Sequence, residues 1–136
     1  MRTQHPLFVA AAVGLGGAAG ALFRYVIMES SGNGLGAAAT GLLIINVLGS
    51  ALLAVVLVVG EHRFQEHRCH HLWRPVLATG VLGGFTSTSA FAVISLELGG
   101  MHGVLYAVTS VGLALGAFSA MQHLTQALVS DSRGQR

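Results

Sequence analysis

An uncharged stretch from Pro75 to Leu96 contains, near its middle, the run GGFTSTS at residues 83–89. The stretch is long and apolar enough to cross a bilayer, which takes about 20 helical residues. The run places two glycines and four side-chain hydroxyls near the middle of the bilayer. Polar groups there cost free energy unless the hydroxyls and the backbone N–H and C=O groups find hydrogen-bond partners. Irregular backbone of this kind occurs where it is buried in protein or lines a path for an ion or solute. The sequence therefore predicts a membrane helix that is broken near residues 83–87 and forms part of a transport path.

The composition requires a membrane environment. Of 136 residues, 53% are hydrophobic and 9% are charged, whereas soluble domains carry about 25% charged residues. The first apolar stretch is longer than the roughly 7–15 residues of a signal-peptide core, so we expect it to be retained. We predict an all-α membrane protein with one domain over residues 1–136 and a broken third helix. Its four transmembrane helices are expected at about residues 7–28, 35–60, 75–98 and 103–128.

Basic residues are unevenly distributed between the two sides of such a bundle. With four spans, both termini and the middle loop share one side, and six arginines lie there: Arg2, Arg63, Arg68, Arg74, Arg133 and Arg136. The two opposite loops hold Glu29 and Glu97 but no basic residue. Because positively charged loops face the cytoplasm, we predict a cell-membrane protein with both termini in the cytoplasm.

Polar side chains inside the expected spans are few, and each has a structural and a functional interpretation. Arg24, at the end of the first span, can extend to the interface or attract anions. Asn46 can join helices by a hydrogen bond or donate to a permeating anion. Tyr106 and Ser110 share one face of the fourth span and can form a track of hydroxyls for an ion. Tyr106 can equally be an anchor at the membrane interface. The residues alone leave both interpretations open.

Small residues in the first span have a structural interpretation. Gly16 and Gly20 are four residues apart and lie on one helix face. This spacing is typical of helices whose backbones approach closely in a membrane. We therefore expect the first span to pack tightly against a neighbour along this face.

The middle loop is rich in potential metal ligands, namely His62, His67, Cys69, His70 and His71. Such a cluster can hold zinc, but the interleaved arginines favour a solvated basic loop. Cys69 is the single cysteine, so an intrachain disulfide is excluded. No nucleophile–base or carboxylate pair lies within the spans, and the sequence does not indicate an enzyme.

Three motifs resemble those of the Fluc (CrcB) fluoride channels: GGAAGALFRY at residues 16–25, NVLG at 46–49 and GGFTS at 83–87. The resemblance covers nearly the whole chain, because the size, the four spans and the broken third span also agree. This family is bacterial, assembles as antiparallel dimers, conducts fluoride passively and holds a structural sodium ion at the dimer centre. The resemblance implies that this chain exports fluoride across the plasma membrane and lowers fluoride in the cytoplasm.

The resemblance also implies roles for individual residues. Backbone carbonyls of Gly83 and Thr86 would bind the structural sodium ion. An unwound turn frees such carbonyls, and a hard cation prefers oxygen ligands. Amide, hydroxyl and aromatic-edge groups suit an anion. The fluoride pore would include Arg24, Asn46, Ser87, Thr88, Phe91, Tyr106 and Ser110.

The chain departs from the family pattern just after the break. Thr88 stands where the family has the first of two pore phenylalanines, and Phe91 matches the second. Ala90 and Ala92 stand where the family has hydroxyl residues, and Ile94 replaces a glutamate. The glycine–threonine break is thus kept, while much of the fluoride lining is changed.

The arginine distribution bears on the expected partner subunit. An antiparallel homodimer needs one sequence that inserts both ways, so its arginines should be divided about evenly. Six arginines against none favour a heterodimer, in which a paralogous subunit of opposite orientation supplies the missing pore groups. Some members of the family occur as such pairs, and a homodimer is the alternative.

Two other functions fit a four-span chain of this length. Small multidrug-resistance exporters share the plan, but they depend on a membrane-embedded glutamate in the first span, and here Glu29 lies only at its end. A non-conducting scaffold would use Asn46 and the hydroxyls only to pack helices. The lack of acidic residues within the spans suits an anion path and disfavours a cation path.

Overall fold

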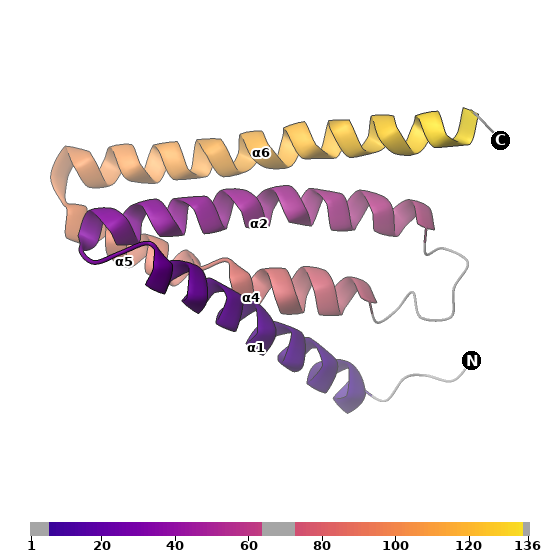
Figure 1. Ribbon diagram of the computed structural model, residues 1–136, viewed down its shortest axis with the longest axis horizontal. Helices are drawn as coiled ribbons and strands as arrows, with labels where there is room; N and C mark the ends of the chain where they lie inside the picture. Colours follow the sequence, from indigo (N-terminus) through magenta and orange to yellow (C-terminus); the bar gives the residue numbers. More distant parts are fainter. Residues whose placement is uncertain (1–5, 64–72, 135–136) are drawn as a thin grey trace.

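The computed structural model describes residues 6–63 and 73–134. Its helical segments are α1 (Pro6–Ser30), α2 (Leu35–Arg63), the π-helix η1 (Pro75–Leu82), α4 (Gly83–Phe85), α5 (Thr88–Leu98) and α6 (Gly100–Gly134). Since η1, α4 and α5 follow one another as a single bent helix, the described ranges form four membrane-length helices (Figure 1). The predicted all-α class with a broken third helix is confirmed.

Part of the predicted basic side lies outside the described residues. This applies to Arg2, Arg68 and Arg136 and to the possible metal ligands His67, Cys69, His70 and His71. The side chain of His62 is not described either. Metal binding by the middle loop therefore stays a prediction.

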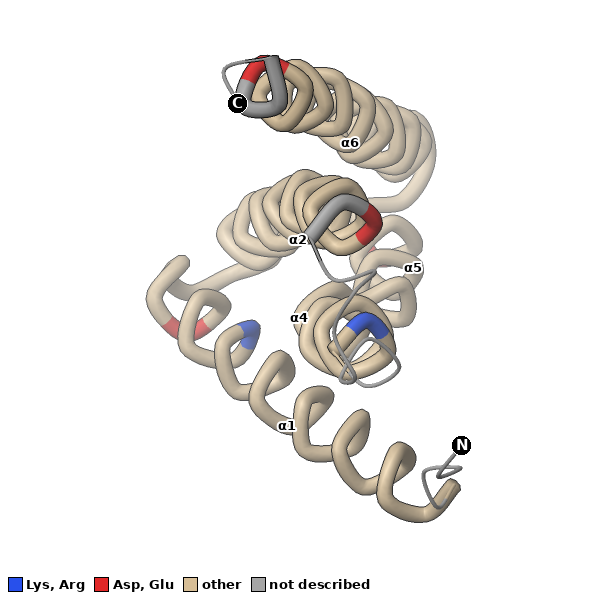
Figure 2. The backbone as a smooth tube through the Cα atoms, turned by 90° about the vertical axis from the view of Figure 1, so that its right-hand side faces the viewer, with Lys and Arg blue, Asp and Glu red and all other residues tan. Residues whose placement is uncertain are grey.

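Apolar side chains cover the outside of the bundle. Leu15, Leu96 and Val108 are 75%, 81% and 67% exposed, and charged residues are rare along the described helices (Figure 2). Such an exterior is stable only in lipid or against another subunit. Each of the four helices is long and apolar enough to cross a bilayer. The chain is a multi-pass membrane protein.

The helices pack as two closely associated pairs. α2 and α6 run in the same direction and lie side by side along their lengths, and α1 crosses η1 and α4 obliquely (Figure 1). α2 lies between α6 and the broken helix (Figure 1). Both ends of the described chain lie at the same end of the bundle, because the number of spans is even. Leu42 and Ile45 of α2 are fully buried and mark the small core.

Glycines bring α1 and the broken helix into backbone contact. A Cβ on Gly20 would collide with the Val81 carbonyl oxygen, and one on Gly84 would collide with the Gly17 carbonyl oxygen. At Gly16 the nearest atom to an added Cβ would be the Val76 carbonyl oxygen, at 2.9 Å. The close packing predicted for the Gly16–Gly20 face is confirmed.

The break in the third helix lies at Thr86 and Ser87. Thr86 has φ −76° and ψ 156°, and Ser87 has φ −144° and ψ 104°, so both are extended. Gly83 is helical, with φ −65° and ψ −36°. The glycines therefore do not unwind the chain, and the break lies at the end of the predicted range 83–87. Ser87 then begins α5 as its N-cap, because its Oγ accepts the Ala90 N–H at 3.3 Å.

Two α1 glycines provide a matched test of this packing. Gly20→Ala should lower the free energy of unfolding by about 1–3 kcal/mol, because the added methyl group displaces the η1 backbone. Gly14→Ala should be neutral or slightly stabilising, because nothing lies within 4 Å of its Cβ position and alanine favours helix. Thermal unfolding of both variants in detergent measures the difference. Equal melting temperatures would contradict the contact.

Candidate functional site

The break releases two backbone carbonyls from the helical hydrogen-bond ladder. In a continuous helix the Ser87 N–H would donate to the Gly83 carbonyl, but here it donates to Asn46 Oδ1 at 3.2 Å. The Ala90 N–H would likewise donate to the Thr86 carbonyl, but it donates to the Ser87 hydroxyl. Arg24 Nη1 donates to the Thr86 carbonyl instead, at 3.3 Å. Both carbonyls predicted to bind sodium have thus lost their helical donors.

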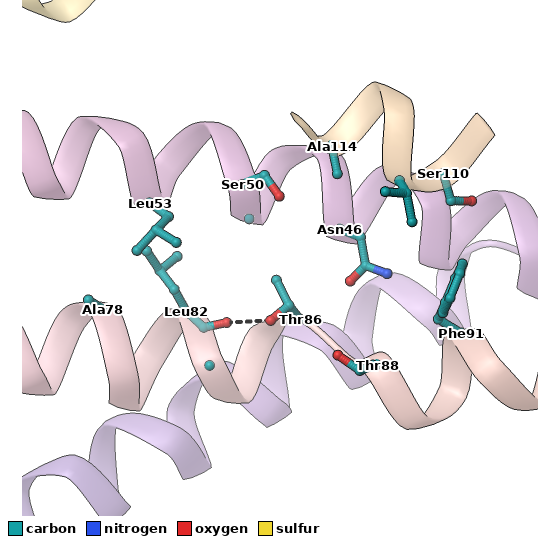
Figure 3. Close-up of a pocket in the computed structure, with 13 residues that line it drawn as sticks. Asn46, Ser50, Leu53, Ala78, Leu82, Thr86, Thr88, Phe91, Ser110 and Ala114 are labelled. Atoms are coloured by element: carbon teal, nitrogen blue, oxygen red, sulfur yellow. Dashed lines mark hydrogen bonds between the residues drawn. The ribbon is translucent and has the colours of Figure 1, made fainter. Parts of the chain in front are cut away.

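The same hydrogen bond orients the Asn46 amide. An N–H group can only donate, so the atom of Asn46 that faces Ser87 is Oδ1. The Nδ2 group, with its two hydrogens, then points away from the break. In Figure 3 the amide nitrogen is directed toward the side of the cavity where Phe91 and Ser110 lie. Asn46 therefore presents hydrogen-bond donors to this space.

A cavity of about 350 Å³ lies between α2, the broken helix and α6 (Figure 3). Leu53, Leu82 and Val111 contribute apolar walls. Its polar lining comes from three different helices and includes the Asn46 amide, side-chain hydroxyls and the backbone of Gly83. The residues that supply it are Asn46, Ser50, Gly83, Thr86, Thr88 and Ser110.

Ser110 provides a buried polar group in this cavity. It is 3% exposed, and its Oγ makes no hydrogen bond of good geometry with the residues that the structure describes. Tyr106 lies one turn earlier on α6, but its hydroxyl donates to the Ala39 carbonyl at 3.2 Å. An unpartnered buried hydroxyl costs about 1–3 kcal/mol. A polar occupant of the cavity would remove this cost.

The predicted site residues are divided between the two sides of the break. Tyr106 adjoins the cavity by stacking on Phe91, with ring centroids 5.9 Å apart, but does not line it. Arg24 and Ser87 lie on the opposite side, in a second cavity between α1 and α5. The predicted site residues that do line the first cavity are Asn46, Gly83, Thr86, Thr88, Phe91 and Ser110.

Sequence reasoning did not single out Ser50, which lines the cavity one turn after Asn46 on α2. The spacing of four residues from Asn46 was the available signal, because it places both side chains on one helix face.

The positions that depart from the family pattern have definite surroundings. Ile94 is 6% exposed and packs with Ala39 and Leu42 in the hydrophobic core, where a glutamate side chain would lack a partner. Ala90 packs against the same cluster. Thr88 lines the cavity.

Comparison with known proteins identifies the family. A family model described as CrcB-like protein, Camphor Resistance (CrcB), matches residues 11–121. The chain belongs to the CrcB family. The resemblance found in the three sequence motifs is thereby confirmed.

Curated relatives of this CrcB chain have a common description. It is 39% identical over 126 residues to the fluoride-specific ion channel FluC of Erythrobacter litoralis, covering 86% of this chain and 91% of that protein. It is 36% identical over 126 residues to FluC of Aeromonas salmonicida, covering 92% of this chain and 95% of that protein. A protein of Thermobifida fusca named fluoride-specific ion channel FluC 2 is 43% identical over 82 residues, covering 60% of this chain and 58% of that protein. No solved structure gives a significant match to the chain.

Proposed function

We propose that this CrcB chain is a subunit of a fluoride-specific ion channel that exports fluoride passively across a bacterial plasma membrane. The names of its curated relatives support this function. The arginines at one end of the bundle support an orientation with both termini in the cytoplasm. Membership of the family favours a channel over a proton-coupled drug exporter or a non-conducting scaffold.

The observation that carries the proposal is the orientation of the Asn46 amide. Fluoride holds its water tightly, so a path through the bilayer has to replace that shell with donors. Asn46 Nδ2 faces a cavity that the buried Ser110 hydroxyl also lines. Thr88 adds another hydroxyl, and Phe91 can present its positive ring edge. These groups together provide donors for a small, dehydrated anion.

Asn46→Asp separates the two functions of this side chain. A carboxylate can still accept the Ser87 N–H, so the break should be kept, but it offers no donor and repels an anion. Fluoride efflux from proteoliposomes should fall about tenfold or more, because a hydrogen bond to a charged group contributes about 1.5–3 kcal/mol. Thr40→Val is the matched control, since Thr40 lies on the same helix and its hydroxyl bonds only the Gly36 carbonyl. Unchanged efflux in Asn46→Asp, with normal elution from a size-exclusion column, would contradict the proposal.

The released carbonyls of Gly83 and Thr86 fit the structural sodium ion that the family resemblance implies. Carbonyl oxygens are suitable ligands for a hard cation. The Thr86 carbonyl accepts a hydrogen bond from the Arg24 guanidinium and keeps a second lone pair for a cation. Two carbonyls from one chain do not complete the oxygen shell of a cation, so further ligands would have to come from elsewhere, such as a second subunit. Sodium bound there would join the subunits at their broken helices.

Removing sodium should therefore weaken the assembly. Exchange into N-methylglucamine should lower the melting temperature of the purified assembly, and adding sodium back should restore it. Bound ligand stabilises by about 2.7 kcal/mol at a hundredfold excess over its dissociation constant. Choline at equal ionic strength controls for salt effects. A melting temperature independent of sodium would count against the site.

A second subunit is needed because the cavity is incomplete in one chain. Gly83 and Thr88, which line it, are exposed, and α1 and α6 bury few of their apolar side chains. The arginine distribution favours a single orientation for this chain. We propose an antiparallel heterodimer with a paralogous subunit of opposite orientation. The number in the name of the Thermobifida relative suggests that paralogues of such proteins occur in one organism.

Expression with and without such a paralogue tests this assembly. The chain alone should give little fluoride efflux in proteoliposomes, since all copies insert with the same orientation, and co-expression with an oppositely biased paralogue should restore it. Two-tag affinity purification measures whether the subunits form a complex. Robust efflux from this chain alone would show that a homodimer suffices.

A further inference from the structure

A third cavity, of about 410 Å³, lies at the end of the bundle where both described termini are found. It is formed by the end of α2, the residue before η1 and the second half of α6. Phe118 and Leu57 line its inner side. Its polar groups are Glu61, Arg74, Gln122 and Gln126. None of these groups has a role in the site described above.

This cavity shares two helices with the cavity at Asn46. On α6 the residues that line the two cavities recur at every fourth position, a row that winds gradually round the helix: Ser110, Ala114, Phe118, Gln122 and Gln126. On α2 the lining residues also recur at spacings of three or four: Asn46, Ser50, Leu53, Leu57 and Glu61. Since α2 and α6 pack side by side in the same direction, the two cavities follow one another along the same pair of helices.

The outer cavity offers more donors than acceptors to an anion. Arg74 is exposed and makes no hydrogen bond or ion pair with any residue whose side chain is described. Gln122 and Gln126 each carry an amide NH₂ group. Glu61 supplies the only carboxylate among the lining residues and would oppose an anion. Because the charges of Glu61 and Arg74 act on an anion in opposite senses, the proposed chemistry can be tested by neutralising each charge in turn.

We propose that this cavity is an anion-binding vestibule. Arg74, Gln122 and Gln126 hold a small hydrated anion from the aqueous phase, before it passes Phe118 toward Asn46. The Glu61 carboxylate repels the anion and so weakens its binding. The anion can therefore leave the vestibule as well as enter it. The inference rests on the proposed channel function in that the natural anion is fluoride in transit.

The single tryptophan of the chain reports on this vestibule. The Trp73 ring packs directly on Gly60, a residue of the vestibule wall. Iodide quenches tryptophan fluorescence on collision, and it is an anion that can enter an open aqueous cavity. Its quenching constant should fall about twofold to fivefold in Arg74→Gln and rise by a similar factor in Glu61→Gln.

Three controls make this measurement specific. Acrylamide, a neutral quencher, should quench the wild type and both variants equally. Asp131→Asn removes a carboxylate from the same end of α6 outside the vestibule and should change iodide quenching little. If added phosphatidylglycerol abolishes iodide quenching in micelles, a lipid phosphate occupies the cavity and the proposal is overturned.

Fluoride efflux provides the second readout. The double variant Gln122→Leu, Gln126→Leu should lower efflux at least twofold, and Glu61→Gln should raise it. Normal efflux and quenching in all of these variants would overturn the vestibule and leave the channel intact. Quenching that follows the charges in a protein that conducts no fluoride, alone or with a partner, would support the anion site and overturn the proposed function.

Discussion

The hydrogen bond from the Ser87 N–H to Asn46 Oδ1 is the interaction on which the rest of the structure depends. A helix that breaks within a membrane exposes backbone groups that lipid cannot satisfy. Here the freed N–H is satisfied by a side chain of the neighbouring helix. The same contact directs the Asn46 donors into the cavity and leaves the Gly83 carbonyl without its helical partner. One hydrogen bond therefore couples the break to both features expected of a channel subunit.

Close packing of glycines makes the other side of the break possible. Gly16, Gly20 and Gly84 bring α1 so near to the broken helix that their backbones touch. At that separation Arg24 reaches the Thr86 carbonyl, the second group released by the break. Arg24 on one side of the break and the Asn46 amide and Ser110 hydroxyl on the other are groups that can donate hydrogen bonds to an anion. This agrees with the anion specificity proposed for the assembly.

The two cavities that adjoin α2 and α6 support the proposed second subunit. Polar groups line both the cavity near the break and the cavity at the end of the bundle, and the lining of the first includes the exposed residues Gly83 and Thr88. Exposed apolar surface on α1 and α6 would otherwise face lipid. A second subunit that covers the open side would both complete the cavity and bring two more carbonyls to the broken helices.

The sequence alone determined the four helices and the broken third span, and it singled out Asn46 as a polar group that needs a partner, because charge-free stretches must cross a bilayer and polar groups within them need partners. Tertiary structure decided the position of the break at Thr86 and Ser87, after a helical Gly83 and a Gly84 that packs against α1. It also decided that the Tyr106 hydroxyl bonds Ala39, and that Arg24 and Ser87 lie across the break from Asn46's cavity. These outcomes depend on contacts between residues 41 to 67 positions apart. Local patterns and residue types do not specify such distances.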